Sequence, residues 1–193
     1  TMRMTSVETM ATYMGTKITG GSMVYLTSTG AISNAASVSF TQFDASKYDH
    51  YEFWFQNVIP VTDDVALYGL TSSDGGSSYD AGASDYRSNT VAEGTSVAYG
   101  LITSHLPDIG SAAEEMGLNF MCTLNSPHTT AYTTFAPYGG SQVGSNGATY
   151  GSCDYYQGFT RRSAADVDAI QFKFSSGNIE SGEIVMYGIA NGT

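Results

Sequence analysis

The chain has 193 residues, the usual length of a single domain with a sizeable hydrophobic core. Charged residues make up 13% of it, about half of the usual ~25%, and Gly, Ser, Thr and Tyr take their place. This composition favours strands and turns over long helices. The formal net charge of -11 argues against nucleic acids and anionic membranes as partners. We therefore expect an all-β protein that binds neither.

The first twenty residues differ from the rest of the chain. Apolar residues recur there close to helical spacing, namely Met4, Val7, Met10, Ala11 and Met14, three of which are methionines. Gly20-Gly21 then interrupts the pattern. We expect a short N-terminal arm or helix over residues 1–20, followed by one β-sandwich domain over residues 21–193. Because thioether side chains adapt to partner surfaces, the three methionines are the predicted assembly contacts.

After Gly21 the hydrophobic period becomes two, which is typical of strands. The strongest segment is 48–60, where Trp54 lies on the face opposite to Phe53 and Phe55. The predicted strands are 23–27, 37–40, 48–60, 65–70, 96–102, 118–124, 130–135, 152–159, 169–174 and 182–189.

Strands separated by Gly-, Ser- and Asn-rich turns, such as 141–151, predict an antiparallel β-sandwich with a jelly-roll-like arrangement. Residues 184–187 are apolar on both faces and are expected in a central strand. Two triplets should face each other between the sheets: Tyr51, Phe53 and Phe55 with Ile170, Phe172 and Phe174.

Sequence motifs for catalysis are absent: there is no G-x-S-x-G nucleophile elbow, phosphate-binding loop or dinucleotide fingerprint. His50, His105 and His128 lack metal-ligand spacing and are expected in loops or at strand edges. The carboxylate pairs Asp63-Asp64 and Asp166/Asp168 could suggest glycoside hydrolysis, but such pairs more often form turns. The sequence predicts a protein that is not an enzyme and needs no cofactor.

The loop over residues 71–87 contains Ser72-Ser73-Asp74-Gly75-Gly76-Ser77-Ser78-Tyr79, which resembles the Asp-box turn of sialidases and other β proteins. In such a turn the aspartate caps backbone N–H groups and glycine supplies positive φ, so the expected role of the motif is structural. The alternative is a Ca²⁺ site, for which Asp74, Asp80 and Asp85 are the candidate ligands.

Trp54, with tyrosines nearby, is a candidate for stacking on a glycan, although tryptophan more often belongs to the core. Cys122 and Cys153 are expected to be reduced, buried thiols, with a disulfide as the alternative. The start Thr1-Met2-Arg3 has no signal-peptide pattern, which predicts synthesis and folding in the cytoplasm.

Two stretches together resemble a family of small virion proteins of tailed bacteriophages. One is Tyr48-Asp49-His50-Tyr51-Glu52-Phe53-Trp54-Phe55-Gln56-Asn57-Val58-Ile59-Pro60, and it continues to Leu67, Ser73-Asp74-Gly75-Gly76 and Tyr86-Arg87. The other covers residues 170–189. The resemblance extends over most of the chain from about Ser37 onward. It implies a structural, fibre or decoration role and offers no catalytic residues.

We expect a non-enzymatic virion structural protein that is synthesised in a host cytoplasm. The favoured role is a capsid decoration, cement or head-attached component. The expected partners are the major capsid protein or tail components, together with further copies of this chain in a symmetric oligomer such as a trimer. A tail-fibre or receptor-binding tip is the first alternative. A carbohydrate-binding module or glycan-active enzyme is the second. A buried Trp54 would favour assembly, and a convergent acid pair beside exposed aromatic residues would favour the glycan alternative.

Overall fold

The computed structural model of the protein describes residues 23–88, 95–103, 109–111, 117–138, 141–144, 150–153 and 158–190. For 141–144 and 150–153 it describes the backbone only. The predicted N-terminal arm, with Met4, Met10 and Met14, lies outside these ranges, as does His105. The described residues form strands, bridges, turns and loops without a helix, and so contain no helix that could cross a membrane.

Fourteen strands occur within the described residues. They are β1 (Met23–Ser28), β2 (Val38–Phe40), β3 (Tyr48–Pro60), β4 (Leu67–Ser72), β5 (Tyr86–Ser88), β6 (Thr95–Val97), β7 (Gly100–Leu101), β8 (Leu118–Asn125), β9 (Thr134–Tyr138), β10 (Ser141–Gly144), β11 (Tyr150–Cys153), β12 (Phe159–Arg161), β13 (Ala169–Phe174) and β14 (Ile179–Ala190).

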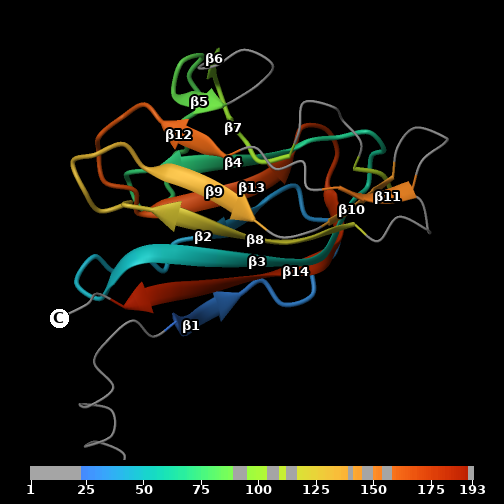
Figure 1. Ribbon diagram of the computed structural model, residues 1–193, viewed down its shortest axis with the longest axis horizontal. Helices are drawn as coiled ribbons and strands as arrows, with labels where there is room; N and C mark the ends of the chain where they lie inside the picture. Colours follow the sequence, from blue (N-terminus) through green and yellow to red (C-terminus); the bar gives the residue numbers. More distant parts are fainter. Residues whose placement is uncertain are drawn as a thin grey trace, which may run out of the picture.

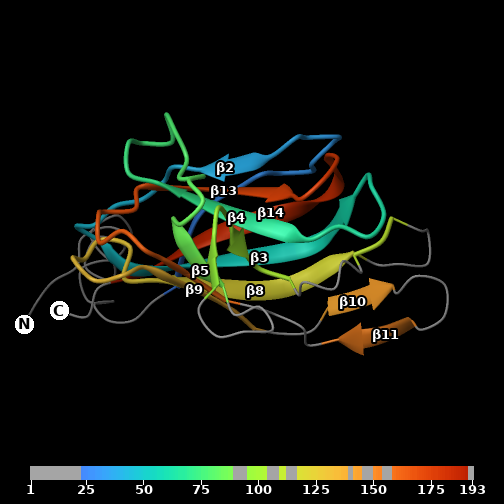
Figure 2. The ribbon, with the colours of Figure 1, turned by 90° about the horizontal axis from the view of Figure 1, so that it is seen from above.

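The strands form two main antiparallel sheets. The large sheet has the order β1-β14-β3-β8-β9-β12-β5-β6, the small sheet has the order β2-β13-β4-β7, and β10 pairs with β11 alone. Figure 1 looks onto the large sheet, with β1 at one end and β5 and β6 at the other. Figure 2 shows β2 and β13 on one side and β3 and β8 on the other. The predicted all-β antiparallel sandwich is confirmed, and the jelly-roll arrangement stays a prediction.

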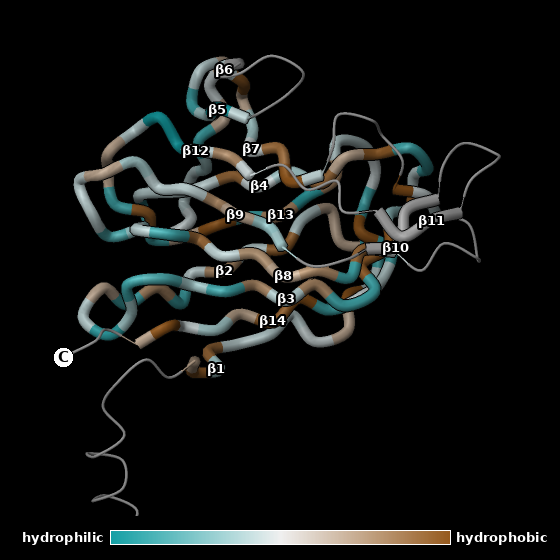
Figure 3. The backbone as a smooth tube through the Cα atoms, in the orientation of Figure 1, coloured by the Kyte–Doolittle hydropathy of each residue, from teal (hydrophilic) through white to brown (hydrophobic). Residues whose placement is uncertain are grey.

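The core lies between the two sheets and is rich in phenylalanine. All six side chains predicted to face it are at most 3% exposed. The ring of Phe172 on β13 meets Phe53 and Phe55 on β3 edge to face, with centroids 5.2 and 5.0 Å apart. Such edge-to-face contacts are favourable aromatic geometries. Figure 3 colours hydrophobic stretches brown, and they occur in strands of both sheets.

Several predicted strand boundaries need correction. The segment 96–102 is divided, because a bend at 98–99 carries the chain from β6 in the large sheet to β7 in the small sheet. The strand expected at 130–135 begins only at Thr134, because residues 127–131 form a turn in which the Thr129 hydroxyl accepts from the Ala131 amide. The expected turn at 141–151 contains β10, and the expected strand at 152–159 is two separate strands.

The strand β14 lies between β1 and β3, as its two apolar faces predict. Its pairing with β3 shifts register around Gly182, whose φ of +118° favours glycine. A Cβ at this position would lie 2.6 Å from the carbonyl oxygen of Asn57. The bulge therefore allows two backbones to approach closely without ending the strand.

Candidate functional site

The outer face of the large sheet carries a cluster of aromatic and apolar side chains, here called the aromatic face. Its members are Tyr25 on β1, Tyr187 on β14, Trp54 on β3, Met121 on β8 and Tyr138 on β9. The register aligns Tyr25 with Tyr187, and it aligns Trp54 with Met121 and Met121 with Tyr138. Five strands therefore contribute to one continuous surface, which no sequence motif marks.

Trp54 is half-buried at the centre of this face. Its indole ring is tilted by 48° against Tyr187 at a centroid distance of 4.9 Å, and Nε1 donates to the Glu52 carboxylate at 3.1 Å. The Trp54 side chain therefore lies outside the core. Tyr187 holds its ring in place, and Glu52 holds its Nε1 atom. Trp54 is not fully buried, whereas burial of Trp54 is the condition under which the sequence favours assembly over glycan binding.

Glu52 gives the aromatic face a polar centre. Its register partners are Tyr187 on β14 and Thr123 on β8. Burial, and then the neighbouring Glu52 carboxylate, raise the pKa of the Tyr138 hydroxyl. The Glu52 carboxylate therefore interacts with both Trp54 and Tyr138 within this face.

At the edge of this face, β1 exposes apolar side chains in succession. Met23, Val24 and Tyr25 are 43%, 38% and 60% exposed. Because successive strand residues face opposite sides, the apolar surface extends around both faces of the edge. Within the described residues β1 pairs with β14 alone, which places β1 at the edge of the large sheet.

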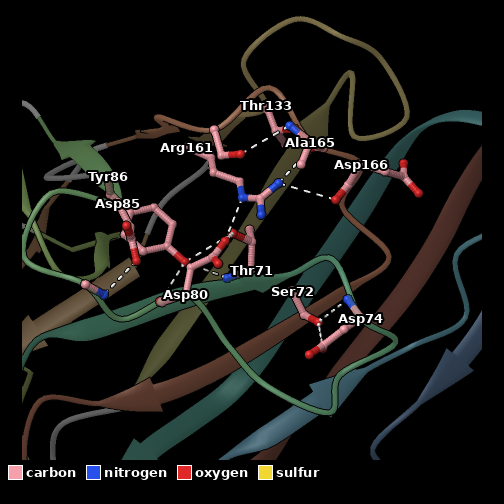
Figure 4. Close-up of polar contacts among 12 residues, drawn as sticks. Thr71, Ser72, Asp74, Asp80, Asp85, Tyr86, Thr133, Arg161, Ala165 and Asp166 are labelled. Atoms are coloured by element: carbon pink, nitrogen blue, oxygen red, sulfur yellow. Dashed lines mark hydrogen bonds and ion pairs between the residues drawn. The ribbon is translucent and has the colours of Figure 1, made fainter.

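The Asp-box-like segment forms the turn that the sequence predicts (Figure 4). Asp74 accepts hydrogen bonds from the Ser78 amide at 2.9 Å, the Ser78 hydroxyl at 2.6 Å and the Ser72 hydroxyl at 2.8 Å. These bonds, led by that of the Ser78 hydroxyl, lower the pKa of Asp74 to about 2. Gly75 and Gly76 have φ of +71° and +82°. The carboxylate is therefore engaged in closing its own turn.

Asp80 belongs to a different structure, a buried polar network around Arg161 (Figure 4). Its Oδ2 accepts from Arg161 Nε at 2.7 Å and from the Thr71 hydroxyl at 3.2 Å. Arg161 is 2% exposed, and its Nη1 also donates to the Ala165 carbonyl at 2.7 Å. Tyr86 donates to the Asp80 carbonyl at 3.0 Å, and burial raises its pKa to about 12. This network fixes two loops to the core.

Asp85, the third candidate Ca²⁺ ligand, accepts from the Gly82 amide at 2.6 Å through Oδ2. Each of the three carboxylates therefore has its own set of protein donors, and the structure does not bring them together. Among the described side chains no group of three or more His, Cys, Asp or Glu is arranged to hold a metal ion.

A chain of hydrogen bonds that the sequence did not suggest joins Tyr51, His128 and Asp166. The Tyr51 hydroxyl lies 2.9 Å from His128 Nε2, and His128 Nδ1 lies 2.8 Å from Asp166 Oδ1. Tyr51 is fully buried, burial raises its pKa to about 12, and its oxygen already accepts from the Asp44 amide at 2.7 Å. The hydrogen bonds therefore tie three segments together, and the Tyr51 hydroxyl is buried among them.

The other residues that the sequence singles out are the pair Asp63-Asp64 and the two cysteines. Asp63 accepts from the Ser111 amide at 3.1 Å, and Asp64 has a φ of +55°, so this pair forms a turn. Cys122 is a free, fully buried thiol whose pKa burial raises well above its usual value. The Cys153 side chain is outside the described part of the structure.

Comparison with protein-family models, curated proteins and solved structures finds no match to this chain. The resemblance to phage virion proteins therefore stays a prediction from the sequence.

Proposed function

We propose that this is a non-enzymatic assembly protein of the kind that forms or decorates a phage virion, and that it associates through the edge strand β1 and the adjoining aromatic face. A second copy of the chain is the proposed occupant of the edge. Two β1 strands related by a two-fold axis would pair antiparallel and join two large sheets into one. This gives a dimer in place of the trimer expected from the sequence.

The observation that carries the proposal is the contrast between β1 and the other edges of the two main sheets. The edge strands β2, β6 and β7 have three, three and two residues, whereas β1 has six. Proteins commonly protect edges by keeping them short or by placing Lys or Pro on them. The sequence Met-Val-Tyr-Leu-Thr-Ser of β1 has no charge and no proline. The strand therefore lacks these two protections, and its pairing with β14 shifts register once, between Tyr25 and Thr27.

The adjoining aromatic face supports the same role. Tyr, Trp and Met are enriched in the centres of protein interfaces, and Trp and Tyr frequently carry most of the binding energy. Tyr25 joins the edge to the face, because its ring meets that of Tyr187 at 6.1 Å and Tyr187 packs on Trp54. A partner seated on β1 would therefore also contact this face.

The non-enzymatic part of the proposal is supported by the state of the polar side chains. Asp74 closes a turn, Asp80 pairs with a buried arginine, and Asp166 bonds to His128. The virion context rests on the sequence resemblance, and a capsid decoration or head-attached component is its simplest form. A tail-fibre or receptor-binding tip is the alternative within the same class.

The test is multi-angle light scattering of the full chain over a concentration series. The wild-type protein should reach twice the chain mass of 20.4 kDa. Tyr25→Lys places a charge on the edge strand and should shift the protein to monomer. Tyr132→Lys is the matched control, because Tyr25 and Tyr132 are each 60% exposed. This control should dimerise like the wild type.

Pairing through β1 is contradicted if the wild-type chain stays monomeric up to about 1 mM. A dimer with a Kd of that size is held together by a dissociation free energy of only ~4 kcal/mol. Equal dimerisation of Tyr25→Lys and the wild type would contradict it as well. Circular dichroism of each variant distinguishes loss of association from loss of folding.

A further inference from the structure

A surface hollow lies at the end of the large sheet that is opposite to β1. It has a volume of about 430 Å³, and its lining combines two arginines, one aspartate, one tyrosine and three hydroxyl residues. The lining residues are Ser84, Asp85, Arg87, Tyr132, Thr160, Arg162 and Ser163. All of them belong to the described part of the chain, and none belongs to the aromatic face.

The hollow concentrates positive charge in an acidic protein. The chain has seven Lys and Arg residues and a net charge of -11, yet two of its arginines, Arg87 and Arg162, face this one hollow. Asp85, the one acidic residue among the described lining residues, accepts a hydrogen bond from the Gly82 amide at 2.6 Å through Oδ2. An anion would therefore meet two guanidinium groups, whose planar forks match the geometry of a carboxylate.

The two arginines differ in how they are held. Arg162 Nη1 donates to the Ser84 carbonyl at 3.2 Å and to the Ser96 hydroxyl at 3.0 Å, which fixes its guanidinium at the rim. Arg87 is exposed on β5, and within the described residues its side chain forms no hydrogen bond or ion pair. One guanidinium is thus positioned by the protein, and the other is free to bind a ligand.

The other lining groups indicate what the anion is attached to. Tyr132 is 60% exposed and offers the face of a ring, on which the apolar side of a sugar can stack. Thr160, Ser84 and Ser163 supply hydroxyls that both donate and accept, which suits the hydroxyls of a sugar. The protein's overall charge repels multiply charged ligands at long range, so a ligand with one negative charge per ring fits better than a polyphosphate.

We infer that this hollow binds a carboxylated sugar, with the carboxylate between Arg87 and Arg162 and the ring against Tyr132. The inference goes beyond assembly through β1 and does not depend on it. β1 and β6 are the first and last strands of the large sheet, and Figure 1 shows them at opposite ends. A subunit held at β1 would leave the hollow open to a ligand.

The test is isothermal titration calorimetry of the full chain with galacturonate, glucuronate and N-acetylneuraminate, each of which carries a single negative charge. The matched ligand control is the methyl ester of galacturonate, which keeps the sugar and removes its charge. Arg87→Gln is the main variant, because the Arg87 side chain forms no hydrogen bond with the described residues. Lys173→Gln is its control, since it removes the same charge from the small sheet.

We expect at least one free acid to bind, and we expect both esterification and Arg87→Gln to weaken binding at least about tenfold, as the loss of one charge-assisted contact implies. Lys173→Gln should bind like the wild type. The inference is overturned if none of the acids binds, if the ester binds as tightly as the acid, or if Arg87→Gln has no effect. Tighter binding of inorganic sulfate or phosphotyrosine than of every acidic sugar would also overturn it.

Discussion

Removing Asp80 should destabilise the protein far more than its position on a surface loop suggests. Arg161 is 2% exposed, and Asp80 is the partner of its Nε at 2.7 Å. Removing one partner of a buried ion pair costs about 3–5 kcal/mol, because an unpaired charge remains buried. Two features moderate this loss: Asp80 is 30% exposed, and Arg161 keeps its bond to the Ala165 carbonyl. We therefore expect Asp80→Ala to cost about 3 kcal/mol, at the lower end of that range.

Replacing Arg161 should lower the free energy of unfolding less than replacing Asp80 does. Arg161→Met fills the buried volume with an apolar chain and leaves Asp80, which can hydrate through its exposed part and keeps the Thr71 hydroxyl at 3.2 Å. A loss of about 1–2 kcal/mol is expected. In the double variant the two losses should not add, and the coupling should be about 2 kcal/mol, as for residues in one network.

Urea unfolding followed by fluorescence measures these values directly, because Trp54 is the only tryptophan. The matched control is the exposed pair of Lys47 and Asp44, whose side chains are 65% and 35% exposed. Replacing Lys47 with Met should shift the midpoint much less than Asp80→Ala. If Asp80→Ala costs less than about 1 kcal/mol, the network does not fix the loops to the core and this reasoning fails.

Three further predictions concern the core, the Asp74 turn and the thiols. Phe172→Ala should cost about 3–5 kcal/mol in the same urea assay, since its ring contacts Phe53 and Phe55 in the opposite sheet; a cost below about 1 kcal/mol would contradict its central place in the core. The hydrogen bonds to Asp74 lower its pKa in the folded protein to about 2, whereas its pKa in the unfolded chain is near 4. The stabilisation from these bonds is therefore complete above about pH 4 and is lost as the pH falls toward 2. Proteolysis of the loop should therefore increase over this interval in the wild type, whereas Asp74→Asn should lose that pH dependence, and identical profiles would count against the turn. Cys122 and Cys153 should react with a thiol reagent in denaturant without prior reduction, and Cys122 should be unreactive in the native protein; a need for reductant would indicate a disulfide.

The long strands could be predicted closely because their hydrophobic period is unambiguous. The strand at 48–60 and the strand at 169–174 have the predicted bounds, and burial alternates over 51–55 in the first and over 170–174 in the second. The short strands were harder to predict from the sequence. β5 has three residues, and β10 is a Ser- and Gly-containing segment, so neither contains enough residues for a period to appear.

The candidate sites depend on contacts between residues that are distant in the sequence. The turn around Asp74 could be predicted because all its donors lie within four residues. The pairing of Asp80 with Arg161 spans 81 residues, and neither residue's neighbours mark it. The aromatic face likewise requires the register of five strands. Composition suggested these residue types, but only the fold places them together.

Hydrogen exchange of the β1 amides, measured by NMR at low and high protein concentration, tests whether two copies of the chain pair through β1. If two copies pair through β1, the amides of β1 that do not pair with β14 should become protected as the concentration rises. The amides of β2, a short edge strand of the small sheet, should exchange at the same rate throughout. Unchanged exchange in β1 at every concentration would contradict assembly through this edge.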